Sequence, residues 1–531
     1  MKRLGFKKNE LIFFLIISII SILPFFLVKY VPSLDGPQHL YTARLIVELI
    51  KGNGFISQFF TFNPIIVGNL SSLYLIAILM LVFPAWLAEK LFLTLYIFGL
   101  ALSFRYFIRS VLKTDSLLYL LIFPFAFTQL FMMGFYNFSV AFIPFFLALG
   151  YLKKHETLGI REAICLAVLG LFIYVSHAIV FAFFGMIVFL QMIFDLFYPL
   201  FFKTFSMKGW MSVVKKYMIV LVAAVPALVL WGIYFISING DTQNSLSVTY
   251  RPVKEILESL YKLWILVGFH VGQEAVPDTI IFCTLVAFVL LAIIPLHRYF
   301  PNKIKPVISH NADSLKWSFI VITLLFLTLF VPDRLVTGSM SVRLSILFYF
   351  GVITWISIRS YPKIIVIIGL SLILGAFTWH RFLIYQHYKH LNKEIAELED
   401  AGQFIKPQTI LFPINCSNNW TQLHFHCYLG VDKPLVNLKN PQATGQMPLM
   451  WNYAKMPNVL LGEMDQTLSG VKWVYGNTLL PPVSAEYIII WKPLNIEAIE
   501  GIPSLINKIN PYYTQTFLSK KSSALLLQIN N

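Results

Sequence analysis

The chain has 531 residues, of which 58% are apolar and only 12% are charged, and its mean hydropathy is +0.73. Soluble globular chains carry roughly 25% charged residues, so this composition excludes an ordinary water-soluble enzyme. Stretches such as 11–28 and 219–238 contain no charged residue and run for about 18–20 residues, which is enough to cross a bilayer. The sequence therefore predicts an integral membrane protein with many spans.

The net charge of +16 lies largely in short connections between apolar stretches. Basic residues cluster within 2–8, 105–113, 153–161, 203–216, 298–316 and 359–363. If all of these clusters lie on one side of the membrane, they are the positive-inside signal that places the amino terminus in the cytoplasm. The charge thus describes topology and predicts no nucleic-acid partner.

About eleven spans keep the basic clusters on one side while the chain alternates. They are 11–28, 88–106, 116–132, 135–150, 163–178, 179–198, 217–238, 278–296, 315–331, 342–358 and 363–380. The apolar stretch 65–83 is left out, because a span there would place every later basic cluster outside. We expect it to form a juxtamembrane or re-entrant helix on the outer face. The first span is expected to be an uncleaved anchor rather than a secretory signal, because no A-x-A-like site follows it.

The composition changes after about residue 380. Leu391, Ile395 and Leu398 recur at helical spacing, and three short apolar runs of strand length follow at Thr409–Pro413, Ala485–Trp491 and Ala524–Ile529. The predicted fold class is a polytopic α-helical membrane domain over 1–380, including outer-face juxtamembrane helices within 35–85. A soluble extracytoplasmic α/β domain is predicted over 381–531. Cys416 and Cys427 in that domain form either a disulfide or two free thiols.

The loop after the first span carries one acid, Asp35, within 31–46. From Pro37 onward, apolar residues share one helical face and charged residues another, so an amphipathic helix lying on the membrane is predicted. Asp35 could be the N-cap of that helix, satisfying its free N–H groups. It could also be a carboxylate that takes a proton from an acceptor hydroxyl at the membrane boundary. The two roles are compatible.

A family resemblance rests on residues 31–109. Asp35 in the first outer loop is followed by a juxtamembrane helix, an apolar helix that opens at Asn63-Pro64, and Lys90 at the head of the next span. This layout resembles the GT-C superfamily, membrane glycosyltransferases that use polyprenyl-phosphate sugars and include protein mannosyltransferases and the aminoarabinose transferases of lipid A. The resemblance implies that Asp35 is the general base and that Lys90 contacts the carrier phosphate.

The chain departs from that family in its acids. Gly36 follows Asp35 where many members carry a second acid, and the next outer loop, 133–137, has none. A divalent cation prefers several oxygen ligands that usually include carboxylates. We therefore predict no metal ligand, and a divalent cofactor stays open.

Three further basic or ionisable residues are candidates at the outer boundary. His39 would share a helix face with Asp35 and could hydrogen-bond it, or be an interface histidine. His177, at the end of the fifth span, could contact a phosphate or sugar, or reach toward water. Arg343 begins a span and could clamp a lipid phosphate bidentately, or pair with headgroups or the C-terminal domain. Arg334 is a second choice.

Polar residues elsewhere are open to two interpretations. Tyr136 and Asn137 could hydrogen-bond a sugar or could be ordinary loop and cap residues. His424 and His426 stand at strand spacing, so they would point to one face and could bind a metal. Because no third ligand is evident, a packed pair is the favoured interpretation.

The leading hypothesis is an inverting glycosyltransferase that acts at the outer membrane face with a polyprenyl-phosphate sugar. Asp35 would be the base, and Lys90 and Arg343 would hold the phosphate. The implied partners are a lipid-linked sugar donor, membrane lipids, and an acceptor that is a protein, a lipid or a glycan. A catalytically inactive GT-C-like scaffold and a transporter or flippase are the alternatives. The last would need ionisable groups deep in the spans, where the sequence offers almost none.

Overall fold

The computed structural model describes residues 7–239, 248–293, 311–334, 338–440, 442–443, 446–452, 459–461, 471–473, 485–498, 503, 507 and 513–530. Two compact units divide the chain. The first, here called the helical unit, comprises Met1–Pro24, Thr94–Met132 and Phe138–Tyr385. The second, the sheet unit, comprises Phe25–Leu93, Met133–Asn137 and Gln386–Asn531. Since this division does not address the expected boundary at 380, that boundary stays a prediction.

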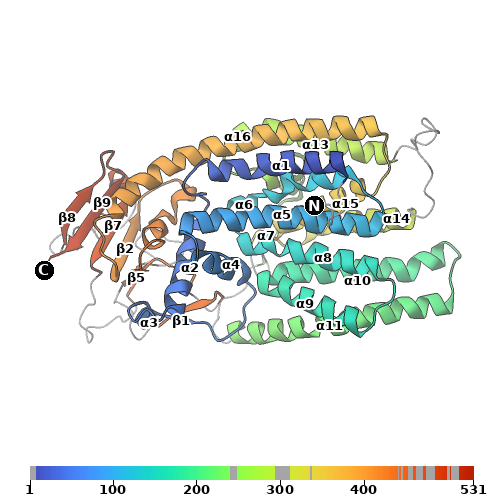
Figure 1. Ribbon diagram of the computed structural model, residues 1–531, viewed down its shortest axis with the longest axis horizontal. Coiled ribbons are helices and arrows are strands. Elements are labelled where there is room, and N and C mark those ends of the chain that lie inside the picture. Colours follow the sequence, from blue (N-terminus) through green and yellow to red (C-terminus); the bar gives the residue numbers. More distant parts are fainter. Residues whose placement is uncertain are drawn as a thin grey trace. The chain divides into compact units, whose positions relative to one another are not determined.

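The helices of the helical unit run side by side (Figure 1). Their bounds are α1 (Lys8–Phe26), α5 (Ala85–Leu112), α7 (Tyr136–Val140), α8 (Phe142–Lys154), α9 (Ile160–Ser176), α10 (Ala178–Phe201), α11 (Met207–Asn239), α12 (Val253–Tyr261), α13 (Val271–Ile293), α14 (Asn311–Phe330), α15 (Met340–Ser357) and α16 (Lys363–Gly402). Four of them, α1, α5, α7 and α16, extend into the sheet unit. Among the described residues, eight helical segments are long and apolar enough to cross a membrane. The prediction of a multi-pass membrane protein is confirmed.

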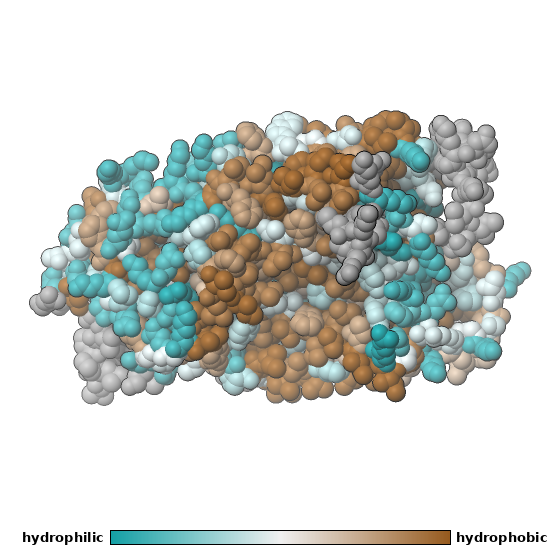
Figure 2. All heavy atoms as spheres, viewed as in Figure 1, coloured by the Kyte–Doolittle hydropathy of each residue, from teal (hydrophilic) through white to brown (hydrophobic). Residues whose placement is uncertain are grey.

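Burial distinguishes the helices that face lipid from those inside the bundle. Only 17% of the most apolar window of α11 is buried, against 83% in α15. The exposed side chains of α11 are large and apolar, including Val222 and Ile236, and such surfaces appear as broad brown areas in Figure 2. An apolar patch of this extent is stable only against another apolar phase. Hence α11 is a lipid-facing helix, and α15 belongs to the core.

One predicted span is wrong. In place of a continuous helix over 116–132, the chain forms 3-10 helices at Leu117–Ile122 and Pro124–Ala126 and a single turn, α6 (Gln129–Met132). Pro124 has no N–H to donate to a helix, which weakens a continuous helix at this point. Most of these residues are buried, and backbone of this kind is tolerated at membrane depth only inside protein.

The sheet unit contains a five-stranded mixed sheet with the order β3-β2-β7-β9-β8. Its strands are β2 (Thr409–Asn415), β3 (Leu435–Asn437), β7 (Tyr487–Trp491), β8 (Tyr513–Leu518) and β9 (Ala524–Ile529). The three predicted strands correspond to β2, β7 and β9 and are neighbours in the sheet. The helical periodicity of Leu391, Ile395 and Leu398 is also confirmed, since all three are buried on α16.

The N-terminal part of the sheet unit holds α2 (Gly36–Ile50), α3 (Ile56–Phe59), β1 (Phe60–Phe62) and α4 (Ser71–Met80). Strand β1 pairs antiparallel with β4 (Leu449–Trp451), and a further pair joins β5 (Val459–Leu461) to β6 (Val471–Trp473). Helix α4 has ten residues, about 15 Å, whereas a hydrocarbon core is about 30 Å thick. It is therefore too short to span a membrane.

Helix α2 forms as predicted but does not lie on the surface with one face free. Twelve of its fifteen residues are buried, because it packs against α4 on one side and the 3-10 helix Phe425–Gly430 on another. Even Glu48 on its charged face is buried, in an ion pair with Arg44 at 2.7 Å. Both the apolar face and Glu48 of the charged face of α2 are therefore buried inside the sheet unit. The expectation of a helix with one face free on the membrane surface is corrected.

Candidate active site

The Asp35 carboxylate is not used to cap α2. Asp35 occupies the N-cap position, but its side chain makes no capping hydrogen bond. Ser33 takes over that role, since its Oγ accepts a hydrogen bond from the N–H of Gly36 at 3.0 Å. The purely structural interpretation of Asp35 as an N-cap is therefore corrected, and the carboxylate stays available for other chemistry.

Backbone contacts hold Asp35 in a narrow space. Its N–H donates to the Met133 carbonyl at 3.0 Å. A Cβ on Gly134, whose φ is +90°, would lie 2.7 Å from the nitrogen of Gly36 and 2.9 Å from that of Asp35. A Cβ on Gly36 would lie 2.4 Å from Ser33 Oγ and 2.9 Å from the hydroxyl of Tyr136. A side chain at position 36 would therefore require the Ser33 and Tyr136 side chains to move.

The C-terminal part of the chain brings His424 to the Asp35 carboxylate. His424 Nε2 lies 3.9 Å from Asp35 Oδ1. Burial raises the pKa of Asp35 from 3.8 to about 7, and burial with the nearby charge of Lys439 lowers the pKa of His424 to about 3. Near neutral pH His424 is uncharged, so it excludes water from Asp35 without stabilising its anion. The Asp35 side chain is still 24% exposed, which leaves room for a proton donor to reach it.

His424 and His426 are not on a strand, contrary to the sequence-based expectation. They flank Phe425 at the start of a 3-10 helix, and their ring planes are 77° apart with centroids 6.0 Å from each other. His426 Nδ1 is 2.7 Å from Asn437 Nδ2, so the two rings have separate partners. Within the described ranges no cluster of three or more His, Cys, Asp or Glu could hold a metal ion. Cys416 and Cys427 are buried free thiols.

The His39 backbone N–H donates to the Asp35 carbonyl at 3.0 Å, but the His39 ring has other partners than the Asp35 carboxylate. Its Nε2 lies 2.8 Å from the carbonyl of Gly134 and its Nδ1 3.3 Å from Gln442 Nε2. This pattern fits a neutral ring whose Nε2 donates and whose Nδ1 accepts. Burial lowers the pKa of His39 to about 4, consistent with that neutral form. The expected bond between the Asp35 and His39 side chains is therefore corrected, and His39 holds the Gly134 loop in place.

Tyr136 and Asn137 use their polar atoms within the protein. The Tyr136 ring stacks on His39 at a centroid distance of 5.3 Å, and its hydroxyl lies 3.2 Å from Glu89 Oε1. Asn137 Oδ1 accepts from the N–H of Ser72 at 2.8 Å, and its Nδ2 donates to the Asn69 carbonyl. Asn137 thereby fixes the start of α4. These contacts favour positioning roles over direct contact with a sugar.

Lys90 lies at the head of α5 in the same unit as Asp35. Its ammonium donates to the Val28 carbonyl at 2.5 Å and lies 4.7 Å from the centre of the Trp86 ring. The neighbouring Glu89 is fully buried and accepts from the N–H of Val31 at 3.4 Å. Lys90 is only 3% exposed, so in this conformation its charge is directed at protein groups.

His177 and Arg343 come together in the helical unit. His177 caps α10 by accepting a hydrogen bond from the N–H of Ile179, and its Nε2 lies 3.3 Å from a terminal nitrogen of Arg343. The Arg343 guanidinium also lies 5.1 Å from the centre of the Phe138 ring. The two predicted substrate-binding residues, His177 and Arg343, are thus neighbours. Arg334, the second choice, forms an isolated antiparallel β-bridge with Thr249.

Two sets of buried polar groups include residues that the sequence did not single out, among them Gln38, Asn440 and His380. In the sheet unit, Gln38 Nε2, His424 Nδ1 and Asn440 Nδ2 are buried without a hydrogen-bond partner among the described residues. In the helical unit, Glu274 accepts three backbone hydrogen bonds before α13 and lies 3.2 Å from His380. Of the first set, only Asn440 stands in a polar run of the sequence, 437–442.

Comparison with known proteins identifies the fold. No protein-family model matches the chain, and no curated protein matches it. Among solved structures, the chain is similar to ArnT from Cupriavidus metallidurans bound to undecaprenyl phosphate, with 10% sequence identity, 97% of each chain covered and a TM-score of 0.54. Apo ArnT from the same organism gives 11% identity, the same coverage and a TM-score of 0.48. The chain therefore shares the fold of that ArnT structure, and the predicted fold class, a multi-pass helical membrane protein with a C-terminal sheet region, is confirmed.

Proposed function

We propose that the protein transfers a sugar from a polyprenyl-phosphate donor to an acceptor hydroxyl at the outer face of the membrane. The observation that carries this proposal is the Asp35 carboxylate, which makes no capping hydrogen bond and is partly exposed. The fold in which it lies is shared with ArnT, whose structure was determined with bound undecaprenyl phosphate. With a pKa of about 7, it is well matched to accept a proton near neutral pH. The outer-face orientation follows from the basic connections.

In the proposed reaction Asp35 removes the proton of the acceptor hydroxyl as its oxygen attacks the anomeric carbon. The bond from that carbon to the phosphate oxygen breaks, and the carrier leaves as polyprenyl phosphate. Attack from the face opposite the phosphate inverts the anomeric centre. Negative charge grows on the leaving phosphate, so nearby cations stabilise the transition state.

Lys90 and Arg343 are the proposed phosphate ligands. Lys90 would exchange its bond to the Val28 carbonyl for a phosphate oxygen, a stronger charge-assisted contact. Arg343 is held by His177 and Phe138, which fixes the plane of its guanidinium. Because a bidentate fork is specific to arginine, Arg343→Lys should weaken binding of undecaprenyl phosphate even though the charge is kept.

The decisive experiment measures the release of undecaprenyl phosphate from a panel of undecaprenyl-phosphate-linked sugars by full-length protein in membranes. Asp35→Asn should lower the rate by about 10²–10⁴-fold while binding of undecaprenyl phosphate is retained. Asp432→Asn, at an exposed carboxyl of the same unit, is the matched control and should leave the rate unchanged.

Two outcomes would contradict the proposal. If Asp35→Asn turns over at the wild-type rate, Asp35 is not the base. If the wild-type protein binds undecaprenyl phosphate but releases none from any donor of the panel, the inactive scaffold becomes the better explanation.

A further inference from the structure

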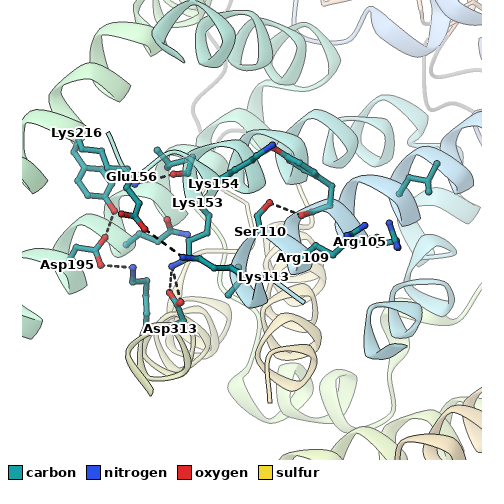
Figure 3. Close-up of a pocket in the computed structure, with 17 residues that line it drawn as sticks. Arg105, Arg109, Ser110, Lys113, Lys153, Lys154, Glu156, Asp195, Lys216 and Asp313 are labelled. Atoms are coloured by element: carbon teal, nitrogen blue, oxygen red, sulfur yellow. Dashed lines mark hydrogen bonds and ion pairs between the residues drawn. The ribbon is translucent and has the colours of Figure 1, made fainter. Parts of the chain in front are cut away.

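A cavity of about 800 Å³ lies at one end of the helical unit, within the size range of small-ligand sites. Seven of its lining residues are lysine or arginine, against three acids. Most of the lining residues come from α5, the end of α8, α10, and the N-terminal parts of α11 and α14. Figure 3 shows the labelled side chains of these elements gathered around this space.

The cavity joins basic clusters that are far apart in sequence. Four separate clusters of the positive-inside pattern contribute to it, through residues such as Arg109, Lys154, Lys216 and Lys316. A topological signal requires only that these residues lie on one side of the membrane. It does not require that they line one cavity, so their convergence is an additional fact of the fold.

Five of the seven basic side chains of the cavity have a carboxylate partner, and the partners of Arg105 and Arg109 lie outside the lining, at Glu10 (2.5 Å) and Asp115 (3.0 Å). Lys153 pairs with Asp313 at 2.7 Å and Lys316 with Asp195 at 2.5 Å (Figure 3). The third acid, Glu156, lies 4.0 Å from Lys113, and both of these side chains are more than 80% exposed.

The remaining lysines have no carboxylate partner. Lys216 donates to the carbonyl of Leu152 at 3.1 Å, and the Lys154 ammonium has no hydrogen bond or ion pair among the described residues. Positive charge is therefore left over inside a concave site, where it attracts an anion more strongly than on a flat surface.

The surroundings favour an anion that carries apolar chains. Helices α10 and α11, which supply Asp195 and Lys216, also present exposed Phe197, Leu200 and Leu221. A phosphate in the cavity could thus continue into acyl chains along a lipid-facing surface. Basic pockets between membrane helices on the cytoplasmic side are suited to anionic headgroups.

We propose that this cavity binds a phosphate-bearing headgroup, and that its source is an inner-leaflet phospholipid with two phosphates, of the cardiolipin type. The proposal does not rest on the glycosyltransferase activity. It assigns the cavity a lipid ligand that stabilises the cytoplasmic end of the bundle.

The test uses full-length protein in phosphatidylcholine nanodiscs, titrated with tetraoleoyl cardiolipin, dioleoyl phosphatidylglycerol or inorganic pyrophosphate. We expect cardiolipin to bind most tightly and to raise the melting temperature. The double variant Lys113→Gln/Lys154→Gln should weaken cardiolipin binding on the order of tenfold or more. Both lysines are exposed, so folding should be preserved, and this is checked by size-exclusion chromatography.

The matched control is Lys208→Gln/Lys215→Gln, which removes the same charge from exposed positions of α11 outside the cavity. An equal loss of cardiolipin binding in both double variants would show that only the overall positive charge of this end of the protein matters, and would contradict binding in the cavity. Pyrophosphate binding as tight as cardiolipin, and sensitive to the cavity variant, would keep the phosphate site but overturn the lipid source. If none of the three ligands binds, the proposal is wrong.

Discussion

At the scale of single residues, the surroundings of Asp35 determine when it can act as a base. Its pKa is raised to about 7 by burial alone, with no charged partner opposing that shift. A base must be deprotonated to accept a proton, so activity should rise with pH through about 7 and level off above it. A pH–rate profile of sugar transfer measures this midpoint directly.

His424 is expected to set that midpoint. Because His424 is neutral and lies 3.9 Å from the carboxylate, its main effect is to keep water away. His424→Ala should let water in and move the midpoint from about 7 toward the ordinary value of 3.8. His426→Gln, which removes a second imidazole from the same segment, should leave the midpoint in place. A lower rate at every pH with an unchanged midpoint would show that His424 has only a structural role.

At the scale of elements, the segment Met133–Asn137, which ends in the first two residues of α7, holds the start of α2 in place. It accepts the Asp35 N–H through Met133 and the His39 ring proton through Gly134. Its close approach is possible only because Gly134 has no side chain and tolerates a φ of +90°. This five-residue segment therefore determines the position of Asp35, the candidate base.

Gly134→Ala should displace Asp35. The new Cβ would collide with backbone nitrogens of Asp35 and Gly36 and would adopt a disfavoured φ, together costing on the order of 1–3 kcal/mol. We expect a lower melting temperature and a large loss of transfer rate. Gly54→Ala is the control, because a Cβ there meets nothing within 4 Å. Wild-type activity in Gly134→Ala would mean that the loop does not position the base.

At the scale of the whole molecule, residues Phe25–Leu93 and the C-terminal segment belong to one compact unit. Strand β1 pairs with β4, and the Tyr41 hydroxyl donates to the Leu435 carbonyl at 2.8 Å while accepting from the N–H of Asn437. Asn392 and Tyr30 exchange hydrogen bonds through backbone and side chain. The segment predicted as a soluble domain, 381–531, therefore depends on residues contributed by the N-terminal part of the chain.

Expressed alone, a fragment of residues 381–531 should not fold into a stable domain. It would lose β1 and expose the surface that α2 covers, including Leu435 and Leu429, which are buried in the whole protein. Thermal denaturation followed by circular dichroism should show no cooperative transition. The full-length protein in nanodiscs serves as the reference. A sharp two-state transition in the fragment would support an independent domain beginning near residue 381.

The sequence by itself determined the class of the molecule, most membrane helices and the three strands β2, β7 and β9, because these follow from local hydropathy and periodicity. It also singled out Asp35, the one acid within 31–46. Only the tertiary structure decided that Ser33 caps α2, that a side chain at position 36 would meet Ser33 and Tyr136, and that His39 meets Gln442, which is 403 residues away. Such contacts depend on chain folding between distant segments, and no local pattern of residues encodes them.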